Sequence, residues 1–231
     1  MNNKIKETDQ RVQLLGHALG FEDIALEQLE EIVAFSFEKR YSRGEAIFNQ
    51  GEKCNFFYIV SDGLVKVSIC SFSGNRLTYL LAGSGEPLNI VGAFTGAPRL
   101  ISAVAFNEAK VLKIKRKDCL AYAFKHPTII TNIIAILGNA VDSANDKLID
   151  MIEKKVEERL IKVLYTLQQK FGQRLRFTSH DFAELAGTTT ESTLRAMARF
   201  RARGIIKSGR GEVIILEPEQ VRDFGSQTYW V

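Results

Sequence analysis

Near the C-terminal end of the 231-residue chain, two side chains with complementary hydrogen-bonding chemistry stand four residues apart. Glu191 and Arg195 belong to the run TTTESTLRAMARFRARG. Arginine can donate two hydrogen bonds to guanine O6 and N7, and glutamate can accept one from the amino group of cytosine. On a helix, the same spacing also permits a plain surface ion pair. The pair therefore offers base reading in duplex DNA, provided that a helix carries it into a groove.

The preceding residues predict the first of two short helices that would hold this pair. Thr178 is a good N-cap, because its hydroxyl can accept from a backbone N–H that has no partner inside the helix. The helix is predicted over 179–186, and Gly187 ends it because glycine adopts a positive φ at low cost. Phe182 and Leu185 are expected to be buried.

A second helix is predicted over 191–203, capped by Thr189 or Thr190. Its predicted inner face consists of apolar residues: Leu194, Met197, Ala198 and Phe200. Its outer face carries the polar side chains of Glu191, Ser192, Arg195 and Arg199. Two short helices joined by a glycine-containing turn form a helix-turn-helix, whose second helix can enter a major groove.

Beyond Gly204, two β-prone runs flank Gly209-Arg210-Gly211 and predict a hairpin wing, with Lys207 and Arg210 placed to contact phosphate. The residues predicted to contact DNA are then Thr178, Thr189, Thr190, Glu191, Arg195, Arg199, Lys207 and Arg210. Residues 154–210 hold thirteen Lys and Arg against five Asp and Glu, a balance of +8, so the rest carries −4 of the total +4. Such an uneven charge distribution is typical of a protein in which one half binds nucleic acid and the other half has a different function.

The N-terminal half has a different character. The first forty residues read as helical, with Leu26, Leu29, Ile32 and Val33 at helical spacing. From 41 to 114, short apolar or β-rich runs alternate with glycines, which indicates an antiparallel barrel or roll. A further short helix is predicted over 118–124.

A long helix is predicted to begin at Pro127, because the missing N–H of proline would be unpaired at a first helical position anyway. Apolar residues then recur at alternating spacings of four and three: Ile130, Ile134, Leu137, Val141, Ala144, Leu148 and Met151. That period is typical of a coiled coil, whereas a helix packed on its own core follows a period of 3.6. We expect this seam to form a homodimer; an intramolecular stripe is the alternative.

These elements predict an α+β chain in three parts. They are a sensor domain over 1–126 (an antiparallel β-roll with an N-terminal helix), a dimerisation helix over 127–153, and a winged helix-turn-helix over 154–231. No apolar run is long enough to span a bilayer and the polar start does not read as a signal peptide, so a cytoplasmic protein without a membrane partner is expected. Cys54, Cys70 and Cys119 are scattered and odd in number, which argues against a disulfide framework.

Together these segments resemble the Crp/Fnr superfamily of bacterial transcription regulators over almost the whole chain. The resemblance lies in the glycine-punctuated roll (Gly44, Gly51-Glu52, FFYIV, Asp62-Gly63, VKV), in VEERLIKVL, and in FTSHDFAELAGTTTESTLRAMARFRARGII. It implies a homodimer that binds an inverted repeat with TGA-containing half-sites, with RNA polymerase as a partner. It also implies that Glu191 and Arg195 are the main base-reading residues. Thr190 stands where one branch of the family has an additional arginine, and Leu194 where another has serine.

The same resemblance bears on the effector. Members that bind cyclic nucleotides hold the phosphate with an Arg-Ser pair and the ribose with a glutamate upstream of it. Here Arg99 is followed by Leu100 and Ile101, and Asn89 stands ten residues before it; the nearest glutamate is Glu86. Cyclic AMP is therefore not expected to bind. Arg99 is expected to be an ordinary surface arginine, and Asn89 with Arg99 to form at most a weak effector pocket.

Other effectors stay open. An iron–sulfur cluster is not expected, because no cysteine precedes Cys54 and three cysteines cannot supply a four-cysteine set. Haem is an alternative, with His17 or a cysteine as its ligand, whereas His126 and His180 are expected to be structural residues at helix starts. A small apolar or anionic molecule in the roll, redox control through a cysteine, and no ligand at all are further alternatives. The spacing of His and Cys predicts no metal site.

Two functions of other classes share parts of this pattern. A cyclic-nucleotide-binding regulatory or channel module would share the roll, but it would not need the winged helix-turn-helix. An enzyme built on the roll would need converging histidines or carboxylates on its strands, and residues 41–114 contain no histidine. The sequence has no nucleophile triad and no phosphate-cradling loop. A non-enzymatic, sequence-specific DNA-binding regulator is therefore the predicted function.

Overall fold

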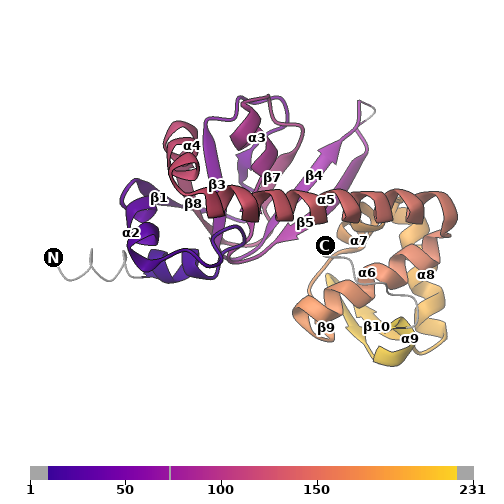
Figure 1. Cartoon of the computed structure of the whole chain (residues 1–231). Helices are drawn as coiled ribbons and strands as arrows, with labels where there is room; N and C mark the ends of the chain where they lie inside the picture. The colour runs from indigo at the N-terminus through magenta and orange to yellow at the C-terminus, as the bar shows by residue number, and fades with distance from the viewer. Residues whose placement is uncertain (1–9, 73, 223–231) are drawn as a thin grey trace. The chain divides into compact units, whose positions relative to one another are not determined.

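A computed structural model describes residues 10–72 and 74–222 of the chain (Figure 1). The chain divides into two units: residues 1–70 with 80–139, and residues 71–79 with 140–231. The boundaries run through one strand and through the long helix, so both elements are shared. The predicted parts 1–126, 127–153 and 154–231 divide the chain by role and stay predictions; residues 1–9 and 223–231 lie outside the described residues.

The first unit begins with helix but turns to strand earlier than predicted. Residues 10–16 are helical, and α2 spans Leu26–Ala34 with Leu29, Ile32 and Val33 buried, whereas Leu26 is exposed. The prediction of helix up to residue 40 is wrong, because Ser36–Tyr41 forms β1 and pairs along its length with β8, Ala109–Lys115. The hydrogen bonds and side-chain contacts of that ladder outweigh local helical preference.

Two four-stranded sheets form the predicted β-roll. One has the strand order β1-β8-β3-β6 and the other β2-β7-β4-β5. The other strands are β2 (Ala46–Phe48), β3 (Phe56–Asp62), β4 (Val65–Cys70), β5 (Arg76–Ala82), β6 (Pro87–Leu88) and β7 (Ser102–Ala105). Large apolar side chains of β3 and β8, such as Phe57, Ile59 and Leu112, are fully buried and form the core of the roll.

Three helices accompany the roll: α3 (Ile90–Thr95), α4 (Arg116–Lys125) and α5 (Pro127–Glu153). The long helix α5 begins at Pro127, as predicted. Its buried face consists of Ile129, Ile133 and Ile136. No single helix among the described residues is long and apolar enough to cross a membrane; α4 and α5, bent by 110° at their junction, meet that criterion only as a pair and only by length and composition.

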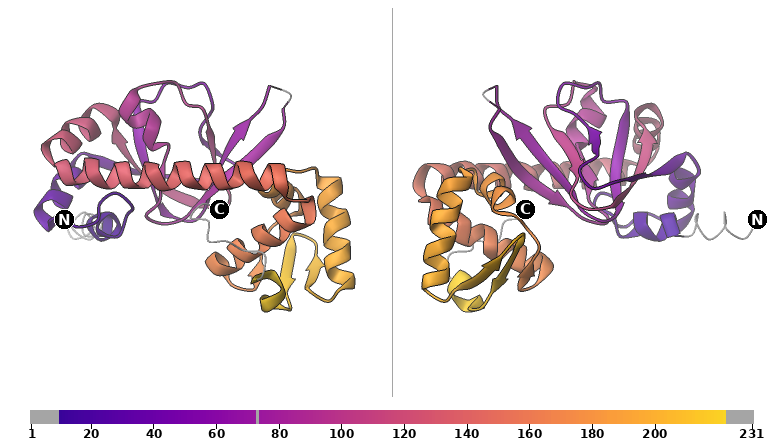
Figure 2. Two further views of the ribbon diagram at one scale, coloured as in Figure 1. Left: turned by 45° about the vertical axis from the view of Figure 1, so that its right-hand side comes forward. Right: turned by 180° about the vertical axis from the view of Figure 1, so that it is seen from behind.

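The second unit contains the predicted winged helix-turn-helix (Figure 2). Its helices are α6 (Val156–Phe171), α7 (Ser179–Ala186), α8 (Thr190–Ala202) and α9 (Pro218–Arg222). Its sheet has the order β10-β11-β9, from β9 (Arg174–Leu175), β10 (Ile206–Gly209) and β11 (Glu212–Ile215). Leu160 and Leu164 of α6, Phe182 of α7 and Phe200 of α8 are fully buried in its core. The predicted α+β fold, with a β-roll, a long helix and a winged helix-turn-helix, is confirmed.

Candidate nucleic-acid interface

Helix α7 begins and ends at the residues that the sequence predicted. The Thr178 hydroxyl accepts from the Asp181 N–H at 3.2 Å, and the Asp181 carboxylate accepts from the Thr178 N–H at 2.9 Å, which is a reciprocal capping box. Gly187 ends the helix with a φ of 60°. A Cβ there would also lie 2.5 Å from Met151 Cε, which the flexible methionine could relieve, so the backbone angle is the main reason for glycine.

Helix α8 is capped by Thr189, whose hydroxyl accepts from the Ser192 N–H at 3.1 Å. Two of the four predicted inner residues are wrong, because Leu194 and Ala198 are exposed. The buried stripe consists of Thr193, Ala196, Met197 and Phe200. These positions recur at spacings of three, one and three, as one face of a helix does. Thr193 and Ala196 are small enough to allow close helix packing. Hydrophobicity alone does not predict that they are buried.

The outer face of α8 brings the predicted base-reading residues together. Arg195 Nη2 lies 3.3 Å from Glu191 Oε1, and Leu194 lies on the same exposed face. Arg199 is turned to α6 instead, where its Nε lies 2.5 Å from Glu157 Oε1. The predicted contact of Arg199 with DNA would therefore compete with this ion pair.

The wing forms as predicted. β10 and β11 pair antiparallel from Ile206 opposite Ile215 to Gly209 opposite Glu212. Lys207 and Arg210 are exposed on this hairpin. Arg174 of β9 forms an ion pair with this hairpin, because its Nε lies 2.6 Å from Glu212 Oε1. The pairing lowers the pKa of the Glu212 carboxyl. The hairpin is thus held in a defined position beside the helix-turn-helix.

Two known family models match the chain in the order that this geometry requires. Residues 38–126 match the cyclic nucleotide-binding domain. Residues 158–224 match the Crp-like helix-turn-helix domain. The chain is a member of the Crp/Fnr superfamily of transcription regulators.

The chain is similar to regulators that carry different names. It is 28% identical over 201 residues to the cyclic AMP receptor protein of Thermus thermophilus, over 85% of this chain and 92% of that one. It is 26% identical over 203 residues to the fumarate and nitrate reduction regulatory protein of Vibrio cholerae, over 83% of this chain and 78% of that one. The solved structure of the c-di-GMP responsive regulator CLP of Xanthomonas campestris shares its fold, with a TM-score of 0.75, 20% identity, and coverage of 84% of this chain and 100% of that one.

In the roll of this Crp/Fnr regulator, Arg99 is not the surface residue that the sequence predicted. It is 2% exposed, and its guanidinium carbon lies 3.9 Å from the ring centroid of Phe48 and 5.1 Å from that of Tyr58. Its Nη2 donates to the Phe56 carbonyl at 3.1 Å. The ring contacts offset part of the cost of burying this charge. Among the described residues, its Nε and Nη1 have no hydrogen-bond partner.

Asn89, the other predicted effector residue, precedes α3 in the left-handed conformation with a φ of 53°. Its Nδ2 lies 3.8 Å from Cys54 Sγ. Burial raises the pKa of the Cys54 thiol, while Arg99 and Arg116 oppose that rise. Cys54 is thus a neighbour of both predicted effector residues, a link that the sequence did not reveal.

The remaining cysteines and histidines offer no assembled site. Burial raises the pKa of Cys119 to about 12, which disfavours the reactive thiolate. His17 is exposed with its Nδ1 2.9 Å from the Gln13 carbonyl, and His126 Nε2 lies 3.3 Å from a Glu31 carboxylate oxygen. Within residues 10–72 and 74–222, no group of three or more His, Cys, Asp or Glu could hold a metal ion. Haem ligation by His17 stays a prediction.

The predicted seam residues lie along α5 with graded exposure. Ile134, Val141, Ala144 and Leu148 are exposed, whereas Ile130, Leu137 and Met151 are half-buried. Met151 packs against the Gly187 turn within the second unit. The long helix therefore has two apolar faces, of which the isoleucine face is covered within the chain and the seam is largely uncovered.

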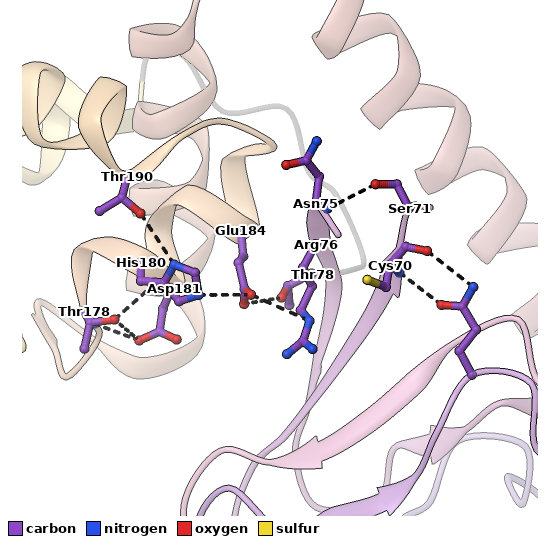
Figure 3. Close-up of polar contacts among 11 residues, drawn as sticks. Cys70, Ser71, Asn75, Arg76, Thr78, Thr178, His180, Asp181, Glu184 and Thr190 are labelled. Atoms are coloured by element: carbon purple, nitrogen blue, oxygen red, sulfur yellow. Dashed lines mark hydrogen bonds and ion pairs between the residues drawn. The ribbon is translucent and has the colours of Figure 1, made fainter. Parts of the chain in front are cut away.

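A polar cluster in the second unit was missed altogether by the sequence analysis (Figure 3). Glu184 of α7 is 5% exposed, and its carboxylate accepts from the Thr78 hydroxyl at 3.3 Å. Arg76 Nε lies 3.9 Å and His180 Nε2 3.3 Å from the same carboxylate. His180 Nδ1 in turn lies 3.5 Å from the hydroxyl of Thr190, the first residue of α8. The sequence shows only the spacing of His180 and Glu184, because the other partners of Glu184, Arg76 and Thr78, are about a hundred residues away from it.

Proposed function

We propose that this regulator is a homodimer that binds an inverted repeat in duplex DNA, with one TGA-containing half-site for each α8. Within a half-site, Arg195 reads guanine and Glu191 accepts from a cytosine amino group on the opposite strand. Two-fold symmetry separates the half-sites by about one helical turn. From that position the protein regulates transcription through contacts with RNA polymerase.

The observation that carries this proposal is the outer face of α8. The side chains of Arg195 and Glu191 are 66% and 77% exposed, one turn apart. The buried stripe that includes Met197 and Phe200 fixes the rotation of the helix, so these two side chains face outward. With Thr190 in place of an arginine, the flanking base pair is less specified.

The apolar seam on α5 supports the homodimer. Ile134, Val141 and Leu148 are large, exposed and seven residues apart. A second copy of the same helix would cover them by knobs-into-holes packing, and a closed pair of this kind is two-fold symmetric. The match of residues 158–224 to the Crp-like helix-turn-helix domain supports the same proposal, because regulators of that family bind DNA as dimers.

We also propose an effector other than cyclic AMP. Leu100 and Ile101 follow Arg99, so no hydroxyl stands beside it to share a cyclic phosphate. The guanidinium is held by the Phe48 ring and the Phe56 carbonyl. The unsatisfied Nε and Nη1 of Arg99 are the donors that an anionic group of another effector would satisfy.

Selection of binding sites from random duplex DNA tests the proposed specificity. An inverted repeat with TGA in each half is expected, and a single unrepeated site would contradict the dimer. Calorimetry with cyclic AMP should show no binding, so a micromolar dissociation constant would overturn the effector proposal. An absorption spectrum of anaerobically purified protein checks haem, because a Soret band would identify haem as the effector.

A further inference from the structure

A small cavity lies in the second unit between α5, α6 and the C-terminal end of α7. Its volume is about 40 Å³, which gives room for about three water molecules. The polar part of its lining comes from two helices: Ser143, Lys147 and Asp150 of α5, and Arg159, Lys162 and Thr166 of α6. The cavity belongs neither to the base-reading face of α8 nor to the roll.

Positive charge exceeds negative charge around this cavity. Asp150 is the one carboxylate in the lining, and it already binds Lys162 Nζ at 2.5 Å and Lys154 Nζ at 2.8 Å. Lys147 has no carboxylate within 4 Å among the described residues, and its ammonium donates to the backbone carbonyl of Thr78 at 3.0 Å. An ammonium that is partly removed from water is costly unless an anion compensates it.

Arg159 adds a second uncompensated charge. Its guanidinium donates to the carbonyls of Ala186 at 3.0 Å, of Lys154 at 2.7 Å and of Gly187 at 3.4 Å. All three partners are neutral. Two of them lie at the turn between α7 and α8, so the cavity is joined directly to the helix-turn-helix.

The acid–base behaviour of Lys147 agrees with this surplus. Burial, together with the nearby charge of Lys162 and opposed by Asp150, lowers the pKa of Lys147 to about 8. The charged groups that face the lysine are Asp150 on its own helix and Arg159 and Lys162 on α6, whereas α7 contributes only Leu185 and Ala186. An anion in the cavity would restore the protonated form.

We propose that this cavity binds a small tetrahedral oxyanion, either inorganic phosphate or the phosphate group of a small metabolite. The ammonium groups of Lys147 and Lys162 and the hydroxyl of Ser143 donate to its oxygens, and charge-assisted bonds of this kind are strong. The volume admits one such group, so the remainder of an esterified ligand extends to solvent. Ser143, Lys147 and Asp150 form a stripe of α5 beside the seam, and Met151 is the one seam residue that lines the cavity.

Isothermal titration of the full chain with sodium phosphate at constant ionic strength tests the site. Wild type is expected to bind, and Lys147→Met to bind at least about tenfold more weakly, which is a loss of about 1.4 kcal/mol. Lys155→Met is the matched control, because Lys155 is an exposed lysine outside the cavity lining and should leave phosphate affinity unchanged. Absence of phosphate binding in wild type, or equal affinity in wild type and Lys147→Met, overturns the proposal.

A second variant and two further ligands extend the test. If thermal melting shows that Lys147→Met is unfolded, Ser143→Ala takes its place and should also weaken phosphate binding. Adenosine monophosphate that binds more tightly than phosphate identifies an esterified ligand, and equal binding identifies the free anion; both support the site. Adenosine that binds as tightly as its monophosphate overturns it. A Lys147→Met variant that loses only salt dependence of DNA binding would place this lysine on DNA phosphate instead, and would also overturn it.

Calorimetric titration at pH 8 in two buffers of different ionisation enthalpy measures the number of protons that the protein takes up when phosphate binds, which is a readout other than affinity. Wild type should take up protons when phosphate binds, because the anion raises the pKa of Lys147. Lys147→Met should take up fewer, and Lys155→Met as many as wild type. Equal proton uptake in all three proteins would contradict a contact between Lys147 and the anion.

Discussion

The guanidinium of Arg195 lies 3.3 Å from the carboxylate of Glu191, one turn apart on the exposed face of α8. An exposed pair of this kind contributes little to stability, since both charges are well solvated. Opening it on DNA is therefore inexpensive.

Replacing Arg195 should relax sequence preference at one base pair of each half-site. Arg195→Ala is expected to cost about 1–3 kcal/mol per half-site, because the bidentate contact with guanine is lost. Selection from random DNA with wild type and variant measures the change. An unchanged preferred sequence would show that Arg195 does not read the base. Arg203→Ala, an exposed arginine at the C-cap of α8, is the control and should keep the guanine preference.

Replacing the basic residues of the wing should have a different effect. Lys207→Ala or Arg210→Ala is expected to weaken binding to all sequences alike, because each removes a phosphate contact rather than a base contact. The slope of log K against log salt should become shallower by about one unit per residue. Binding isotherms over a salt series measure this slope. A change in sequence preference with an unaltered slope would contradict the assignment.

Leu194 should read a thymine methyl group. It is 50% exposed on the base-reading face, and apolar side chains recognise that methyl in the major groove. Wild type should lose affinity when one thymine of the half-site is replaced by uracil, which lacks the methyl group, whereas Leu194→Ser should be insensitive to the same change. Equal sensitivity of both proteins would assign Leu194 no part in base recognition. Thermal stability should hardly change, since the side chain is not in the core.

A charge in the seam of α5 should dissociate the homodimer. Ile134 is 64% exposed in the single chain, so Ile134→Lys should leave the protomer folded. In a dimer it would place two like charges against each other, and monomers that do not bind the operator should result. Sedimentation measures the oligomeric state. Asn139→Lys is the control, because Asn139 is exposed on the opposite face of α5; an intact dimer in both variants would refute the seam.

Stability should rise with pH above about pH 8 in buffer without phosphate. The pKa of Lys147 is lowered from 10.5 to about 8 in the folded chain. Between these values the unfolded chain binds a proton that the folded chain has lost, so the free energy of unfolding increases, by at most about 1.4 kcal/mol per pH unit. Urea denaturation at a series of pH values measures this slope. Lys147→Met should reduce it relative to Lys155→Met, and equal slopes would show that Lys147 is not perturbed.

The bounds of the helix-turn-helix, though not the buried face of α8, could be predicted because its signals are local. Thr178 and Gly187 bracket α7 by a hydroxyl cap and a left-handed turn, both of which a short stretch of sequence specifies. The wing depends in the same way on the turn at Gly211. The roles of Glu191 and Arg195 came from the pairing of their positions with a known family, and the structure places both on the exposed face that such a role requires.

What could not be predicted depends on partners far away in the chain. Ser36–Tyr41 is a strand because β8 lies beside it, some seventy residues later. Arg99 is buried because its guanidinium packs against the rings of Phe48 and Tyr58, and no pattern in the sequence around Arg99 predicts these contacts. Glu184 has polar partners from the tip of a distant hairpin for the same reason.

Helices α7 and α8 are 8 and 13 residues long. Isolated helices shorter than about 12–15 residues are marginal in water, so neither has much stability of its own. Both are maintained by Phe182 and Phe200 in the core that α6 provides. The surface that we propose reads bases therefore forms only together with this core, and local unfolding of the unit would remove it.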